Sequence, residues 1–181
     1  MRNLKQFMLL LMTVSLFTIT SCSSDDDGGG PGAAPSGVLT AKIDGASYQS
    51  MEISSSATIA NTAAGQSLVI IATNSDGYAF SFTFFGYDGV GTYDFDGSTP
   101  AAGVNVASYS ETEVNLSNPQ NSTTELWQAP YENTMAGSLS VSEETDSKLI
   151  GTFEFTCKNV GGDQSVKTIT DGSFNLNKQV Q

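Results

Sequence analysis

The side chains of this sequence that could most readily take part in catalysis are carboxylates. Hydrolysis of a glycosidic bond needs two carboxyl groups that face each other across a cleft, about 5 to 9.5 Å apart. Because an acidic protein also brings carboxylates together by chance, spacing alone does not identify a catalytic pair. The glutamates that could serve are Glu111, Glu113, Glu125, Glu132, Glu143, Glu144 and Glu154.

Asp94 and Asp96, which precede Gly97, come closest to a metal-binding loop. A calcium loop of the EF-hand kind needs further oxygen ligands and a late bidentate glutamate, and none follows at that spacing. The chain has no histidine, which is the commonest metal ligand and the commonest general base near neutral pH. We therefore expect neither a metal nor a cofactor.

A binding surface is suggested by Trp127, Gln128 and Tyr131, which follow the polar loop 117–124. Aromatic rings with a polar handle suit partly wet binding surfaces. These three residues are candidates for a ligand-binding platform. The alternative is that Trp127 caps the open end of the hydrophobic core.

The two cysteines are not expected to pair with each other. Cys157 ends an alternating run on the same face as Phe153 and Phe155, so we expect a buried thiol that packs as a small hydrophobe. A nucleophilic thiol would need a neighbouring base or positive charge, and Lys158 points to the opposite face of the strand.

Residues 1–21 have the pattern of a signal peptide. Arg2 and Lys5 precede an apolar run over residues 7–19, which is shorter than the roughly 20 residues that a membrane-spanning helix needs. Residues 19–22 resemble a bacterial lipobox, and this resemblance implies that Cys22 is acylated and becomes the first residue of the mature chain. The alternative is an ordinary secretory signal with an incidental cysteine.

Residues 22–37 are rich in glycine and proline and lack apolar periodicity, which predicts a flexible tether. Asp25, Asp26 and Asp27 follow Cys22 closely. They resemble the surface-export tag of Bacteroidota lipoproteins, which implies a position on the outer face of the outer membrane. The alternative is a solvated acidic linker.

The balance of charges narrows the range of partners. The chain has 7 Lys+Arg and 19 Asp+Glu, a net charge of −12. Cleavage before Cys22 removes Arg2 and Lys5 but no acid, which leaves 5 − 19 = −14. Because such a surface repels nucleic acids and anionic headgroups, we expect no nucleic-acid partner and membrane contact only through the lipid on Cys22.

Residues 38–178 are predicted to form a single all-β domain. Short runs rich in Val, Ile, Thr, Phe and Tyr alternate with turn residues, and helical periodicity is nearly absent. We predict an antiparallel β-sandwich or flattened barrel of about eight to ten strands, connected largely by hairpins and meanders. The residues expected inside are Val69, Ile71, Phe80, Phe82, Phe84, Phe153, Phe155, Phe174 and Leu176.

Turn residues set the expected limits of the strands. Asp44-Gly45 favours a tight hairpin turn, and Asp171-Gly172 is expected to be a turn between strands 166–170 and 173–176. Residues 67–73 are apolar on both faces and should form a central strand. Residues 113–116 are expected to form a polar strand.

The order of these features resembles a family of small, uncharacterised Bacteroidota lipoproteins that carry a domain of unknown function. The matching motifs are the lipobox, the acidic tether and the segments 40–45, 91–93, 151–155 and 169–174. The resemblance covers nearly the whole mature chain. It implies an all-β fold and carries no site residues or ligand, because none is assigned to the family.

These observations favour a non-enzymatic module of the cell envelope, lipid-anchored at the outer membrane and facing the cell exterior. An acidic, histidine-free β domain on a tether suits the capture of a glycan or an envelope protein, or a structural role. The alternative is a hydrolase that uses two of the glutamates named above. Catalysis needs groups with perturbed pKa values in a cleft, and nothing in the sequence singles out such a pair.

Overall fold

Strands make up nearly all of the regular structure in the computed structural model, which describes residues 33–62, 65–99 and 103–181. The predicted signal peptide, Cys22 and the acidic residues 25–27 lie outside the described residues. No helix in these ranges is long and apolar enough to cross a membrane. The strands are β1 (Leu39–Ile43), β2 (Ala46–Gln49), β3 (Ser55–Thr62), β4 (Gly65–Thr73), β5 (Tyr78–Phe85), β6 (Gly91–Asp96), β7 (Val106–Glu113), β8 (Thr123–Ala129), β9 (Met135–Glu144), β10 (Lys148–Lys158) and β11 (Val166–Val180).

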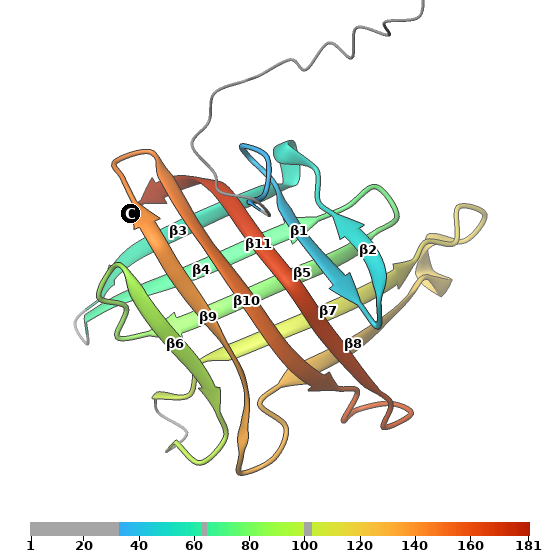
Figure 1. The fold of residues 1–181 in the computed structure, drawn as a ribbon. Helices are drawn as coiled ribbons and strands as arrows, with labels where there is room; N and C mark the ends of the chain where they lie inside the picture. The colour runs from blue at the N-terminus through green and yellow to red at the C-terminus, as the bar shows by residue number, and fades with distance from the viewer. Residues whose placement is uncertain (1–32, 63–64, 100–102) are drawn as a thin grey trace, which may run out of the picture.

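The strands form one sheet that folds over on itself into two layers (Figure 1). We call β6-β9-β10-β11-β1-β2 the front sheet and β3-β4-β5-β7-β8 the back sheet, and the strands of the two sheets cross in this view. At one corner, Lys178–Val180 of β11 pair in parallel with Ala57–Ile59 of β3. At another, Gln128 of β8 pairs with Lys158 of β10.

This architecture confirms the prediction of an all-β sandwich or flattened barrel. The described residues form an 11-stranded sheet, one strand more than the upper limit predicted. The sheet is mixed rather than purely antiparallel, because the end of β11 runs parallel to β3.

The predicted hairpin at Asp44-Gly45 is confirmed. Ile43 pairs with Ala46, so the loop has two residues. Asp44 and Gly45 adopt φ angles of 49° and 86°, and positive φ at both central positions is the requirement of a type I′ turn.

The hydrophobic core lies between the two sheets. Aromatic rings of β5 meet rings of β10, with ring centroids 5.0 Å apart for Phe82 and Phe153 and 5.6 Å apart for Phe80 and Phe153. The prediction of the core is confirmed for seven residues, each at most 4% exposed: Phe80, Phe82, Phe84, Phe153, Phe155, Phe174 and Leu176.

Strand β4 is central, as predicted, but the prediction of its inward residues was wrong. Ile71 is 48% exposed and Val69 shares its face, whereas Leu68 and Ile70 are fully buried. The register of the hairpin decides this, because Leu68 pairs with Phe84 and directly paired residues lie on the same face of a sheet. Since β4 is apolar on both faces, its own alternation did not identify the inner one.

Strand β11 is continuous where a turn was predicted. Phe153 of β10 pairs with Gly172, but Phe155 pairs with Ile169, so β11 has one extra residue here, which is the definition of a β-bulge. Asp171 adopts a φ of 51°, a left-handed conformation that aspartate tolerates better than most residues. The Asp-Gly pair therefore bends the strand instead of reversing it.

Two other parts of the strand prediction also differ from the structure. Strand β3 was not predicted, because Ile59 is its one large apolar residue and its other residues are small or polar, which gives a weak alternation signal. The polar strand expected at residues 113–116 is wrong, since β7 ends at Glu113 and the following residues form a loop.

Candidate functional site

The outer face of the front sheet carries a shallow groove with a volume of about 640 Å³. Its side chains come from cross-strand rows, since residues paired across neighbouring strands share a face. One row carries hydroxyl groups and contains Ser140 of β9 and Thr152 of β10. The adjacent row carries the charge of the groove and contains Ser138, Glu154, Asp171 and Lys42.

Of the two carboxylates in the groove, Asp171 is paired with Lys42 and Glu154 is not paired within the described residues. Lys42 Nζ lies 2.7 Å from Asp171 Oδ2, and the hydrogen bond and negative charge of Asp171 raise the pKa of Lys42 above its ordinary value. Glu154 is exposed, and its side chain has no hydrogen bond or ion pair within the described part of the chain. Its carboxylate is therefore available to a ligand without breaking an existing contact.

The N-terminal segment of the domain crosses β11 beside this groove. The backbone N–H of Ala34 donates to Ser173 Oγ at 2.8 Å, and the N–H of Gly37 donates to the carbonyl of Asn175 at 2.7 Å. The incoming chain is thereby fixed on the front sheet.

Hydroxyl groups, carboxylates and one ammonium group can hydrogen-bond a ligand that is itself rich in hydroxyl or amine groups. Phe153 and Gly172 supply an apolar part of the lining. No group of three or more acidic or cysteine side chains is placed to hold a metal ion among the residues that the structure describes. The arrangement is that of a polar binding groove.

Sequence reasoning did not identify this groove, although a signal was present. Ser138 and Ser140 alternate with the inward residues Leu139 and Val141, so small hydroxyls on an outward face could be inferred from β9 alone. The link to Asp171 could not, because it depends on the bulge in β11.

The predicted platform of Trp127, Gln128 and Tyr131 is not assembled. Trp127 points into the core and is 3% exposed, as in the alternative in which it caps the core. Gln128 is exposed on the outer face of the back sheet. Tyr131 is half-buried, with its hydroxyl 3.5 Å from Thr156 Oγ1.

Trp127 is instead the centre of a polar cap at one end of the core. Its Nε1–H donates to Ser165 Oγ at 2.8 Å, and Lys167 Nζ lies 4.3 Å from the centroid of its ring. Lys167 also pairs with Glu111 Oε1 at 3.0 Å, and the hydroxyl of Tyr109 donates to the same oxygen. These contacts satisfy the polar groups of the cap internally, so they indicate a structural role.

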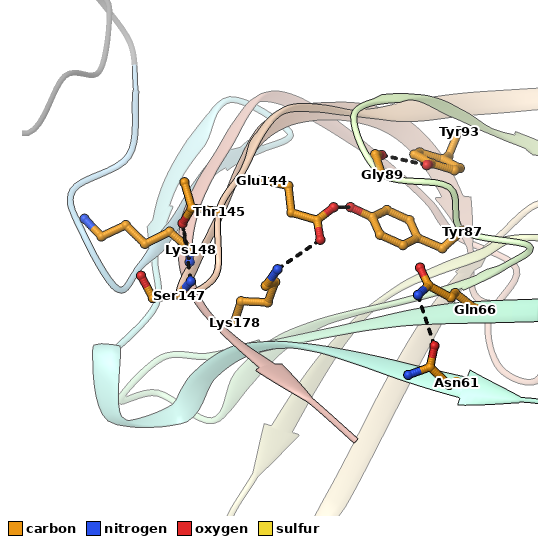
Figure 2. Close-up of polar contacts among 10 residues, drawn as sticks. All are labelled: Asn61, Gln66, Tyr87, Gly89, Tyr93, Glu144, Thr145, Ser147, Lys148 and Lys178. Carbon is orange, nitrogen blue, oxygen red and sulfur yellow. Dashed lines mark hydrogen bonds and ion pairs between the residues drawn. The ribbon is translucent and has the colours of Figure 1, made fainter.

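A second polar cluster forms around Glu144 (Figure 2). Glu144 accepts hydrogen bonds from the hydroxyl of Tyr87 at 2.7 Å and from Lys178 Nζ at 3.0 Å. Burial opposes the ionisation of Glu144, but these two donors outweigh it and hold its pKa below the ordinary value. Burial, followed by the contact with Glu144, raises the pKa of Tyr87. Glu144 is therefore a stable anion and a poor proton donor.

Among the candidate catalytic glutamates, Glu111 of β7 and Glu125 of β8 are direct cross-strand partners. Glu111 is already occupied by Lys167 and Tyr109. Glu154 lies in the groove on the front sheet, whereas Glu111 and Glu125 are on strands of the back sheet. The structure thus pairs Glu111 with Glu125 at the cap of the core rather than in the groove.

Cys157 is fully buried, which confirms the prediction for this thiol. Burial raises its pKa to about 12, so almost none of it is a thiolate near neutral pH.

Comparison with known proteins identifies a family without an assigned activity. The chain belongs to the family described as Domain of unknown function (DUF6252), which matches residues 36–176. No curated protein matches the chain, and no solved structure matches it.

Proposed function

We propose that this member of the DUF6252 family is a lipid-anchored binding module of the bacterial cell envelope, and that the groove on its front sheet binds a hydroxyl-rich ligand of the glycan class. The groove itself is the observation that supports this proposal. It combines hydroxyl side chains with the exposed carboxylate of Glu154, and it lies on a rigid sheet. Sites on rigid strands hold their polar groups in a fixed geometry, which favours selective binding.

The anchor belongs to the same proposal. Residues 1–21 act as a signal peptide, Cys22 carries the lipid, and Asp25, Asp26 and Asp27 direct the protein to the cell surface of a bacterium of the Bacteroidota. From Cys22 to the first described residue the chain can span at most about 40 Å. The groove would therefore be presented close to the outer membrane, within reach of envelope glycans.

Binding to immobilised polysaccharides tests the role of the groove. The mature chain in detergent should be retained on at least one neutral or amino-sugar polysaccharide. Glu154→Gln and Asp171→Asn should weaken retention by about 10- to 100-fold, because hydrogen bonds to charged groups contribute about 1.5–3 kcal/mol. Asparagine preserves the left-handed backbone at position 171.

The matched control is Glu125→Gln, which changes an exposed carboxylate outside the groove. Loss of binding in this variant alone, or equal binding by all variants, would exclude the groove. Release of shortened glycan in the same assay would favour the alternative function, a carboxylate-dependent hydrolase.

The anchor has its own test. Cys22→Ala should leave an uncleaved precursor or release the protein from the membrane, and labelled palmitate on this variant would refute the assignment. Changing residues 25–27 to alanine should preserve lipidation but abolish protease cleavage on intact cells. Unchanged cleavage would mean that the acidic residues are only a linker.

A further inference from the structure

The outward side chains of β3, β4, β5, β7 and β8 include no ionisable group, and we call this surface the uncharged face. Its central row contains Ser56, Ile71, Ser81, Ser108 and Gln128, one from each strand. The remaining outward positions of these strands are Gly, Ser, Thr, Ala, Val, Leu or Phe. The chain carries 19 Asp+Glu and 7 Lys+Arg, yet none of those in the part that the structure describes lies on this face.

The uncharged face also exposes large apolar side chains. Ile71, Phe85 and Leu126 are 48%, 51% and 41% exposed, respectively. They come from three different strands, so the apolar character extends across the sheet. The front sheet differs sharply, because Asp94, Glu154 and Asp171 are on its outer face.

We propose that the uncharged face is a contact surface between two copies of this chain, which pack back to back about a two-fold axis. Two strongly acidic molecules repel each other over most of their surfaces. Facing sheets pack about 10 Å apart, and a face without carboxylates permits that approach between identical chains without bringing like charges together. A two-fold contact uses the same patch on both copies, so this one face is sufficient.

The size of the face meets the requirement for a weak dimer. Five strands about 4.8 Å apart, each about eight residues long with a rise of about 3.3 Å, cover roughly 600 Å² of flat sheet. A pair would bury more than about 1,000 Å² in total, which is the lower end of the range for specific interfaces. We therefore expect reversible association that higher salt strengthens, since salt screens the repulsion between the two acidic chains.

Within the described ranges, the N-terminal segment lies on the front sheet and not on the uncharged face. Ala34 and Gly37 of this segment are held on β11 by their contacts with Ser173 and Asn175. In the dimer both grooves would face outward on opposite sides. This inference does not depend on what the grooves bind.

Cysteine crosslinking in the full chain tests the contact. Ser81 lies on β5, the middle strand of the back sheet, so Ser81→Cys places a thiol near the proposed two-fold axis. A bis-maleimide that spans about 10 Å, the separation of facing sheets, should convert this variant into a species of twice the mass in cells that express it. The matched control is Thr152→Cys on the front sheet, which shares the native cysteines and should stay monomeric.

A second substitution distinguishes self-association from other partners. Ile71→Glu, added to Ser81→Cys, places a carboxylate on the face of both copies and should abolish the dimer band. Leu126→Glu on β8 should do the same, and circular dichroism checks that both variants fold. Absence of the dimer with Ser81→Cys, an equal dimer with Thr152→Cys, persistence after either glutamate, or a crosslink to a different protein would each overturn the proposal.

Discussion

Removal of the Trp127 side chain should strongly destabilise the fold, because the structure places this residue in the core rather than on a binding surface. The ring is 3% exposed, packs 5.9 Å from the Tyr109 ring and lies beneath Lys167. Substitution of a buried tryptophan by alanine costs about 3–5 kcal/mol. Trp127→Phe retains most of the ring contact and loses the hydrogen bond to Ser165, so we expect a smaller loss of about 1–2 kcal/mol.

Urea unfolding followed by far-UV circular dichroism measures both changes. With a denaturant slope of about 2 kcal/mol/M, a loss of 4 kcal/mol lowers the midpoint by about 2 M. Trp127 is also the only tryptophan of the chain, so the wild-type fluorescence should be that of a buried indole and should shift to longer wavelength in the same transition. A loss below about 1 kcal/mol for Trp127→Ala would be too small for a buried residue and would refute the reasoning.

Three further predictions concern Cys157, the Lys178–Glu144 pair and Gly151. Cys157 should not react with thiol reagents at pH 8 until the domain unfolds, and rapid labelling of the native protein would contradict its burial and its pKa of about 12. Because the pKa of Glu144 is lowered on folding, its contribution to stability is present above its unfolded pKa and lost as the pH falls through the folded value. Lys178→Met should cost about 3 kcal/mol near neutral pH and flatten the acid limb of the stability profile, whereas an unchanged acid limb would exclude this pair as its source. Gly151→Ala should cost about 1–3 kcal/mol by overpacking, since a Cβ there would lie 2.5 Å from Phe174. Thermal melts measure this loss. Gly103→Ala is the control and should leave the stability unchanged, because the space around Gly103 is open.

The fold class could be predicted because its signals are local. The φ-permissive pair at Asp44-Gly45 and the alternation of Phe80, Phe82 and Phe84 each specify a turn or a strand without reference to the rest of the chain. The face of β4 could not be decided in this way, since it depends on pairing with β5. The same holds for Asp171, where a turn and a bulge require the same backbone conformation.

The candidate site was harder to predict than the fold. Tryptophan is a residue type that is common in binding sites, which suggested a binding role for Trp127. Its actual position between Tyr109 and Lys167 depends on contacts from β7 and β11. The groove is lined by residues of β1, β9, β10 and β11. Lys42 and Asp171, which are far apart in the sequence, meet only through the pairing of β1 with β11. Such a site is visible only when the order of the strands is known.

An NMR titration of the isotope-labelled chain with a retained polysaccharide tests the proposed binding groove most directly. Amide resonances of β9, β10 and β11 around Ser138, Thr152 and Asp171 should shift in proportion to the bound fraction, and Glu154→Gln should reduce these shifts. Resonances around Trp127 and Ser165 should stay unchanged. Shifts that gather at Trp127 instead, or no shifts at saturating polysaccharide, would contradict the proposal that the front sheet is the binding surface.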